Sequence, residues 1–69
     1  MPNPTEKEWT KDRIAKLRSR LDLTQRAAAE LVGATHSLWS HWEAGRHKPT
    51  KPFQKLLTLI EKEALESAD

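Results

Sequence analysis

Two glycines do most to restrict what the centre of this chain can fold into. Gly33 follows the alanine-rich run 25–32, and Gly45 follows the run 36–44. A threonine stands directly before each run, and threonine is a favoured N-cap because its hydroxyl accepts a bond from a backbone N–H group. Glycine after a run supplies the positive φ that ends a helix. The pattern therefore predicts two short helices, from 25 to 31 or 32 and from 36 to about 44, joined by a tight turn.

Apolar spacing predicts two further helices, one before this pair and one after it. The earlier helix carries Ile14, Leu17 and Leu21 on one face and ends near residue 21. The later helix follows a basic loop, with Thr50 as its cap and Pro52 in its first turn, where proline is tolerated. The apolar stripe of this last helix consists of Phe53, Leu56, Leu57, Ile60 and Ala64.

The start of the first helix is open between two caps. Thr5 with Glu8 forms a capping box, whereas Thr10 as the cap would place Trp9 against Ile14 as a hydrophobic staple. For Trp9, a contact with a second copy of the chain is an equal alternative. Both starts leave the end of the helix near residue 21 unchanged.

Together these elements predict an all-α fold of four or five helices in one domain, with no strand, repeat or linker. Residues 1–4 contain two prolines and are expected to form a flexible tail, residues 5–66 the domain, and residues 67–69 a frayed end. The pair of short helices spans about residues 24–44. The side chains expected in the core are Ile14, Leu17, Leu21, Ala29, Trp39, Trp42, Phe53, Leu56, Leu57 and Ile60.

Composition narrows the kinds of site and partner that this chain can have. It has no cysteine, which excludes disulfides and thiolate metal sites and agrees with a reducing cytoplasm. No apolar run is long enough for a transmembrane helix or a secretory signal, so we expect a cytoplasmic protein without a membrane partner. Residues 11–55 carry ten Lys and Arg against four Asp and Glu, although the whole chain has a net charge of only +2. A basic centre suits a polyanionic partner, and an ordinary solvated surface is the alternative.

The two short helices have the outline of a helix-turn-helix. Ala29 lies where the helices must approach closely, and Trp39 and Trp42 would turn one face of the second helix into the core. The opposite face carries short polar side chains and imidazoles, which are the right size to hydrogen-bond to base edges in a DNA major groove. The residues of this face are Thr35, His36, Ser37, Ser40 and His41. The pattern predicts binding of double-stranded DNA through the second helix.

Two motifs in register resemble the Cro/C1-type (Xre-like, lambda-repressor-like) helix-turn-helix family of transcriptional regulators. They read Thr24-Gln25-x-x-x-Ala29-x-x-x-Gly33 and Trp42-Glu43-x-Gly45-Arg46-x-x-Pro49. The resemblance covers about residues 14–60 and implies a lambda-repressor-like bundle. It also implies a repressor or autorepressor that binds a pseudo-palindromic operator as a homodimer. Small members of the family often regulate phage or toxin–antitoxin operons, so an antitoxin that mainly binds a toxin protein is the alternative.

The resemblance implies roles for individual residues as well. Gln25 would contact a phosphate at the start of its helix, and Arg46 and Lys48 would hold the DNA backbone. Arg18 and Glu43 occupy the positions of an ion pair that is common in the family. The polar face from Thr35 to His41 would lie toward the major groove.

Other kinds of function have weaker support in the sequence. His36 and His41 are five residues apart, which is not the spacing of a helical metal chelate, so no metal site is expected. Catalysis needs a nucleophile, a base and an orienting group in a cleft, and the polar residues here lie on one convex face. We therefore expect neither enzyme activity nor a cofactor or small-molecule ligand. Leu59 lies off the apolar stripe, where a dimer contact and an ordinary exposed leucine are equal alternatives.

Overall fold

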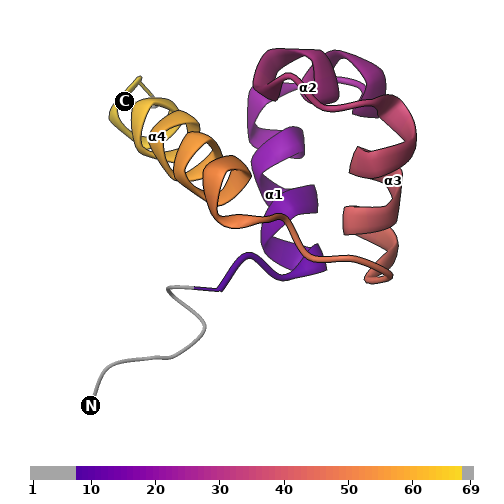
Figure 1. The fold of residues 1–69 in the computed structure, drawn as a ribbon. Coiled ribbons are helices and arrows are strands. Elements are labelled where there is room, and N and C mark those ends of the chain that lie inside the picture. Colours follow the sequence, from indigo (N-terminus) through magenta and orange to yellow (C-terminus); the bar gives the residue numbers. More distant parts are fainter. Residues whose placement is uncertain (1–7, 68–69) are drawn as a thin grey trace.

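The computed structural model describes residues 8–67 and consists of helices joined by short turns (Figure 1). The helices are α1 (Lys11–Leu21), α2 (Gln25–Val32), α3 (His36–Ala44) and α4 (Lys51–Ser67). Helix α1 lies between α3 on one side and α4 on the other, and α2 connects α1 to α3 at one end of the molecule (Figure 1). The described range contains no strand, so the predicted all-α fold is confirmed. The predictions for residues 1–4, for Thr5 and for residues 68–69 lie outside the described residues.

Helix ends are made by local hydrogen bonds at the predicted places. The hydroxyls of Thr10, Thr24 and Thr35 each accept a bond from a backbone N–H three residues on, at 3.3, 3.1 and 3.0 Å. These bonds satisfy amides that have no partner within the helix. Gly33 and Gly45 both have φ of 78° and end α2 and α3. The turn from α2 to α3 is therefore set by residues within and beside it.

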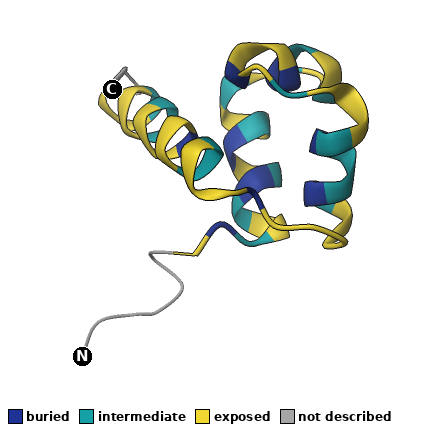
Figure 2. Ribbon diagram, in the orientation of Figure 1, coloured by how far each residue is buried: buried dark blue, intermediate teal, exposed yellow. Residues whose placement is uncertain are grey.

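The core lies between the facing sides of α1 and α3 and extends under α4 (Figure 2). Its largest fully buried side chains are Trp39, Trp42, Ile14 and Leu57. Leu21, Phe53 and Ile60, which were expected in the core, are only partly buried but pack against it. The remaining buried residues of the hydrophobic core are Trp9, Leu17, Ala28, Ala29 and Val32, and Pro49 before α4 is buried as well. No described helix is long and apolar enough to cross a membrane.

The predicted core position of Leu56 is wrong, because this side chain is 42% exposed on α4. Helix α4 turns the side that carries Gln54 and Glu61 toward the rest of the molecule. The Nε2 group of Gln54 donates to the carbonyl of Pro49 at 2.7 Å, and Glu61 binds α1. In this orientation of α4, Leu57 enters the core and Leu56 stays at the surface.

Contacts between distant residues attach α4 to the start of the chain. The indole Nε1 of Trp9 donates to the hydroxyl of Thr58 at 3.1 Å, and Trp9 itself is buried. The Nε and Nη2 groups of Arg13 donate to the two carboxylate oxygens of Glu61 at 3.1 and 2.7 Å. The guanidinium of Arg13 also lies 3.8 Å from the centre of the Trp9 ring. Trp9 thus makes an internal contact that joins α4 to the residues before α1.

Candidate nucleic-acid interface

Helix α3 has one buried face and one polar face. Trp39 and Trp42 are each only 1% exposed, whereas His36 and Ser37 at the start of the helix are exposed. Ser40 and His41 of the predicted interface are half-buried, and Thr35 is exposed but uses its hydroxyl to cap the helix. Because the tryptophans hold the other face in the core, the polar side chains are presented together along the outside of α3.

Aromatic rings in tilted and edge-on contact support the buried face of α3. The ring centres of Trp39 and Trp42 lie 5.4 Å apart, and that of Trp42 lies 5.1 Å from Phe53 of α4 in an edge-on arrangement. Edge-to-face and tilted pairs at such distances add to the stability gained by burial alone. The aromatic series links α3 to the start of α4 and restricts rotation of α3 about its axis.

A carboxylate network joins α3 to α1. The Nε of Arg18 donates to Oε2 of Glu43, and its Nη2 donates to Oε1 at 3.1 Å. The indole Nε1 of Trp39 donates to the same Oε2, and the side chain of Gln25 also hydrogen-bonds to Glu43. A third donor of Arg18, Nη1, bonds to the carbonyl of Leu23 at 3.1 Å. One carboxylate therefore connects α1, α2 and α3.

The charge of Glu43 is stabilised by these donors. Burial on its own would raise the pKa of this carboxyl, but the hydrogen bonds from Arg18, Trp39 and Gln25 outweigh it and leave the pKa below its ordinary value. The same bond raises the pKa of Arg18. Both groups are thus charged at neutral pH, and each compensates the charge of the other, as a largely buried carboxylate requires.

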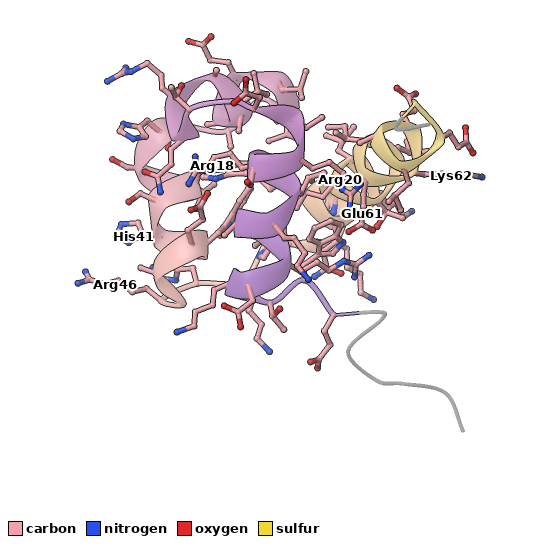
Figure 3. The ribbon with its side chains drawn as sticks, turned by 180° about the vertical axis from the view of Figure 1, so that it is seen from behind. Arg18, Arg20, His41, Arg46, Glu61 and Lys62 are labelled. Atoms are coloured by element: carbon pink, nitrogen blue, oxygen red, sulfur yellow. The ribbon has the colours of Figure 1, made fainter. Side chains whose placement is uncertain are left out.

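Basic side chains gather at the C-terminal end of α3. Arg46 and Lys48 are exposed in the loop after Gly45, and Arg46 projects on the same side of the molecule as His41 (Figure 3). The rings of His41 and His47 meet edge-on with centres 5.2 Å apart. A Cβ built on Gly45 would lie 3.2 Å from the side chain of Lys11, so a cation from α1 also borders this loop. Lys11 was not among the predicted interface residues, because only the packing of α1 against α3 brings it here.

Gln25 occupies a different environment from the one that its expected role suggests. It is half-buried, and its side chain is engaged with Glu43. Its position as the first residue of α2 still leaves backbone amides at the exposed helix end, where a phosphate would be favoured. Among residues 8–67 there is no cluster of three or more His, Cys, Asp or Glu that could hold a metal ion.

Comparison with known proteins gives a match to one family model. The model, described as a helix-turn-helix domain, matches residues 12–59, which include α1 except its first residue, all of α2 and α3, and the first half of α4. Neither the curated proteins nor the solved structures contain a significant match. The matched segment includes every residue of the two short helices, their turn, and the basic loop that follows them. The chain therefore belongs to the helix-turn-helix domain family.

Proposed function

We propose that this protein is a sequence-specific transcriptional regulator of the Cro/C1 type that represses by binding an operator in double-stranded DNA. Helix-turn-helix domains are DNA-binding modules of regulators, and the family match supports that general class. The polar outer face of α3 is the observation that carries the finer proposal. This face ends beside the exposed cations Arg46 and Lys48.

Base reading would come from the N-terminal half of α3. In this motif the second helix lies in the major groove with its first residues closest to the bases. His36 and Ser37 are exposed there, and His41 lies about one turn further along. Thr35 would add its methyl group and backbone, since its hydroxyl already caps the helix. A thymine methyl or a base-edge acceptor is the kind of partner that such side chains recognise.

Phosphate contacts would position α3 in the groove. Arg46 and Lys48 follow α3, and Lys11 lies against the same loop. Each neutralised phosphate contributes a slope of about −0.9 to the dependence of log K on log salt. Three such cations on one side of the reading helix would therefore make DNA affinity strongly dependent on salt.

Repression would follow from occupation of a promoter by two copies. A two-fold symmetric pair of helix-turn-helix domains reads a pseudo-palindrome whose half-sites lie about 34–36 Å apart, or one turn of DNA. The symmetry of the protein would then set the symmetry of the operator.

Selection of bound sites from a random DNA pool tests this function. The wild type should enrich a pseudo-palindromic motif, and His36→Ala should lose about 1–3 kcal/mol of discrimination at particular base pairs. His36 is a cleaner probe than His41, because His41 also contacts His47. Arg46→Ala should weaken binding to all sequences alike and reduce the salt slope by about 1. Arg20→Ala is the matched control, since Arg20 is exposed on α1 and lies on the α4 side of that helix, away from His41 and Arg46 (Figure 3).

Two results would contradict the proposal. A wild-type protein that enriches no motif is not a sequence-specific regulator. A His36→Ala variant that enriches the wild-type motif with the same strength at every position would show that α3 does not read the bases.

A further inference from the structure

The outer face of α4 exposes two large apolar side chains that no other part of the described chain covers. Leu56 is 42% exposed and Leu59 is 59% exposed. They are three residues apart and therefore adjacent on the helix surface. The opposite face of α4 carries Leu57, which is fully buried. The two leucines thus form a small apolar patch on the side of α4 that points away from the core.

Charge changes sign along this same helix. The first half contains Lys51 and Lys55 and no acidic residue, and both lysines are exposed. The second half contains Glu63 and Glu66, which are exposed too. Glu61 is not part of this surface, because Arg13 binds it on the inner side. Lys62 is the one basic residue of the described second half.

We propose that this face of α4 binds the same face of a second copy in an antiparallel, two-fold symmetric arrangement. This inference rests on the homodimer of the proposed function and assigns its interface. In an antiparallel pair related by a two-fold axis, a residue that lies a given number of positions before the residue on the axis faces the residue that lies the same number of positions after it in the other copy. With the axis at Leu59, Lys55 of one copy lies opposite Glu63 of the other, and the same contact is repeated across the axis.

Charge complementarity selects this orientation. In a parallel pair, Lys55 would face Lys55 and Glu63 would face Glu63, and like charges directly opposite one another are unfavourable. In the antiparallel pair both contacts join opposite charges, and Leu56 lies opposite the aliphatic stem of Lys62, a favourable use of a long charged side chain. Charged residues that flank an apolar helix seam commonly decide the orientation of paired helices.

The surface beside Leu59 also accommodates the acidic end of a second helix. An open groove with a volume of about 540 Å³ runs along α4 next to the apolar patch. Its lining residues are Trp9, Lys51, Gln54, Lys55, Thr58 and Leu59. Glu66 lies seven positions after Leu59, so in the dimer it would face residue 52 of the other copy, seven positions before Leu59. Its carboxylate would therefore lie next to Lys51 of that copy. The groove combines apolar surface with two lysines, and it is therefore complementary to the end of a helix that carries leucine and glutamate.

Pairing through α4 leaves the reading helix uncovered. Helices α3 and α4 lie on opposite sides of α1 in both views of the ribbon (Figures 1 and 3). Lys62 on α4 points away from α1, whereas His41 and Arg46 project from the other side of the molecule (Figure 3). A second copy on α4 would thus not cover the residues proposed to bind DNA.

Charge reversal tests the interface, with dimer dissociation of the full chain measured by analytical ultracentrifugation. Lys55→Glu and Glu63→Lys should each weaken the dimer by about tenfold, because two exposed like-charge contacts replace two ion pairs. The double variant should return to within about threefold of the wild type, since opposite charges again face each other. Residues 55 and 63 are about 12 Å apart along one helix, so the rescue cannot come from within a single chain. Lys16→Glu on α1 is the control for a change in net charge.

A second variant removes apolar contact without reversing charge. Leu59→Ala should weaken the dimer by about tenfold or more while its thermal melt stays close to that of the wild type, because Leu59 is 59% exposed in the single chain. Single variants with wild-type dimerisation, or a double variant as weak as the singles, would overturn the antiparallel interface.

The DNA readout separates this inference from the proposed function. A wild-type chain that stays monomeric both free and on a palindromic site, yet still enriches a half-site motif, would overturn the dimer interface and leave base reading by α3 intact. A stable dimer that enriches no motif would contradict base reading by α3 and leave the dimer interface intact. A dimer that is insensitive to all four variants would show that another surface joins the copies.

Discussion

Two arginines of α1 hold the helices on either side of it, and they do so in different surroundings. Arg18 binds Glu43 of α3 and Arg13 binds Glu61 of α4, each with two guanidinium donors. The side chain of Glu43 is 11% exposed and accepts further bonds from Trp39 and Gln25. The side chain of Glu61 is 25% exposed, and its partner Arg13 also stacks on Trp9.

The difference shows what each pair contributes. A carboxylate as buried as that of Glu43 depends on its donors, so loss of Arg18 leaves a charge that water reaches poorly. Water can replace more of the lost contact at Glu61, and such partly exposed pairs contribute less to the free energy of unfolding. The α1–α3 contact is therefore the more sensitive of the two, and it holds the helix that we propose reads DNA.

Removal of Arg18 should give the largest effect. Arg18→Ala should lower the free energy of unfolding by about 3 kcal/mol, because Glu43 is left with only neutral donors. Thermal or urea unfolding followed by circular dichroism measures the change. Lys16→Ala, an exposed cation on the same helix, is the control and should stay within about 0.5 kcal/mol of the wild type.

A double-mutant cycle checks the cause of that loss. Arg18→Ala with Glu43→Ala should cost less than the sum of the two single changes, since no charge remains without its partner. If the two losses simply add, the pair is not coupled and the network does not join α1 to α3.

The α1–α4 contact should be less sensitive. Arg13→Ala should cost about 1 kcal/mol, from a partly exposed ion pair and the lost contact with the Trp9 ring. Arg13→Lys should recover little of it, because lysine cannot present two parallel donors to Glu61. Unfolding at low and high salt provides the measurement, and added salt should reduce the effect more at Arg13 than at Arg18. An Arg13→Ala loss equal to that of Arg18→Ala would refute the distinction drawn between the two contacts.

The dependence of stability on pH sharpens the comparison further. The pKa of Glu43 is lowered in the folded protein, so its contribution to stability is fully present above the pKa of the unfolded chain, about 4.3. That contribution is lost as the pH falls through the lower, folded pKa. Denaturant unfolding between pH 5 and pH 2 should therefore show a steeper loss in the wild type than in Glu43→Gln. Identical slopes in the two proteins would mean that Glu43 is not stabilised in its charged form.

Several features of the site follow from short-range patterns, and the all-α fold was predicted from them. The caps at Thr10, Thr24 and Thr35 and the stops at Gly33 and Gly45 depend on residues within a few positions of each other. The family resemblance added the pairing of Arg18 with Glu43, which the hydrogen bonds now show. The roles of His36, Ser37, Arg46 and Lys48 in DNA binding remain predictions.

Other features depend on how α4 packs, which apolar spacing alone does not determine. Leu56 and Leu57 are neighbours in the sequence and equally apolar, so a stripe on α4 could include both. The contacts of α4 with Trp9 and Arg13 join residues 49 and 48 positions apart, and in the resulting orientation of α4 Leu57 is buried and Leu56 is exposed. The same orientation exposes Leu59 beside lysines and creates the proposed interface.

The sequence by itself determined where α2 and α3 start and stop, because capping and glycine termination act through neighbouring backbone groups. It also determined which face of α3 is buried, because tryptophans three residues apart share one side of a helix. Only the tertiary structure decided the rotation of α4, the place of Lys11 beside Gly45, and the engagement of Gln25 with Glu43. These depend on the angles at which helices cross, and those angles result from the packing of side chains that are far apart in the chain.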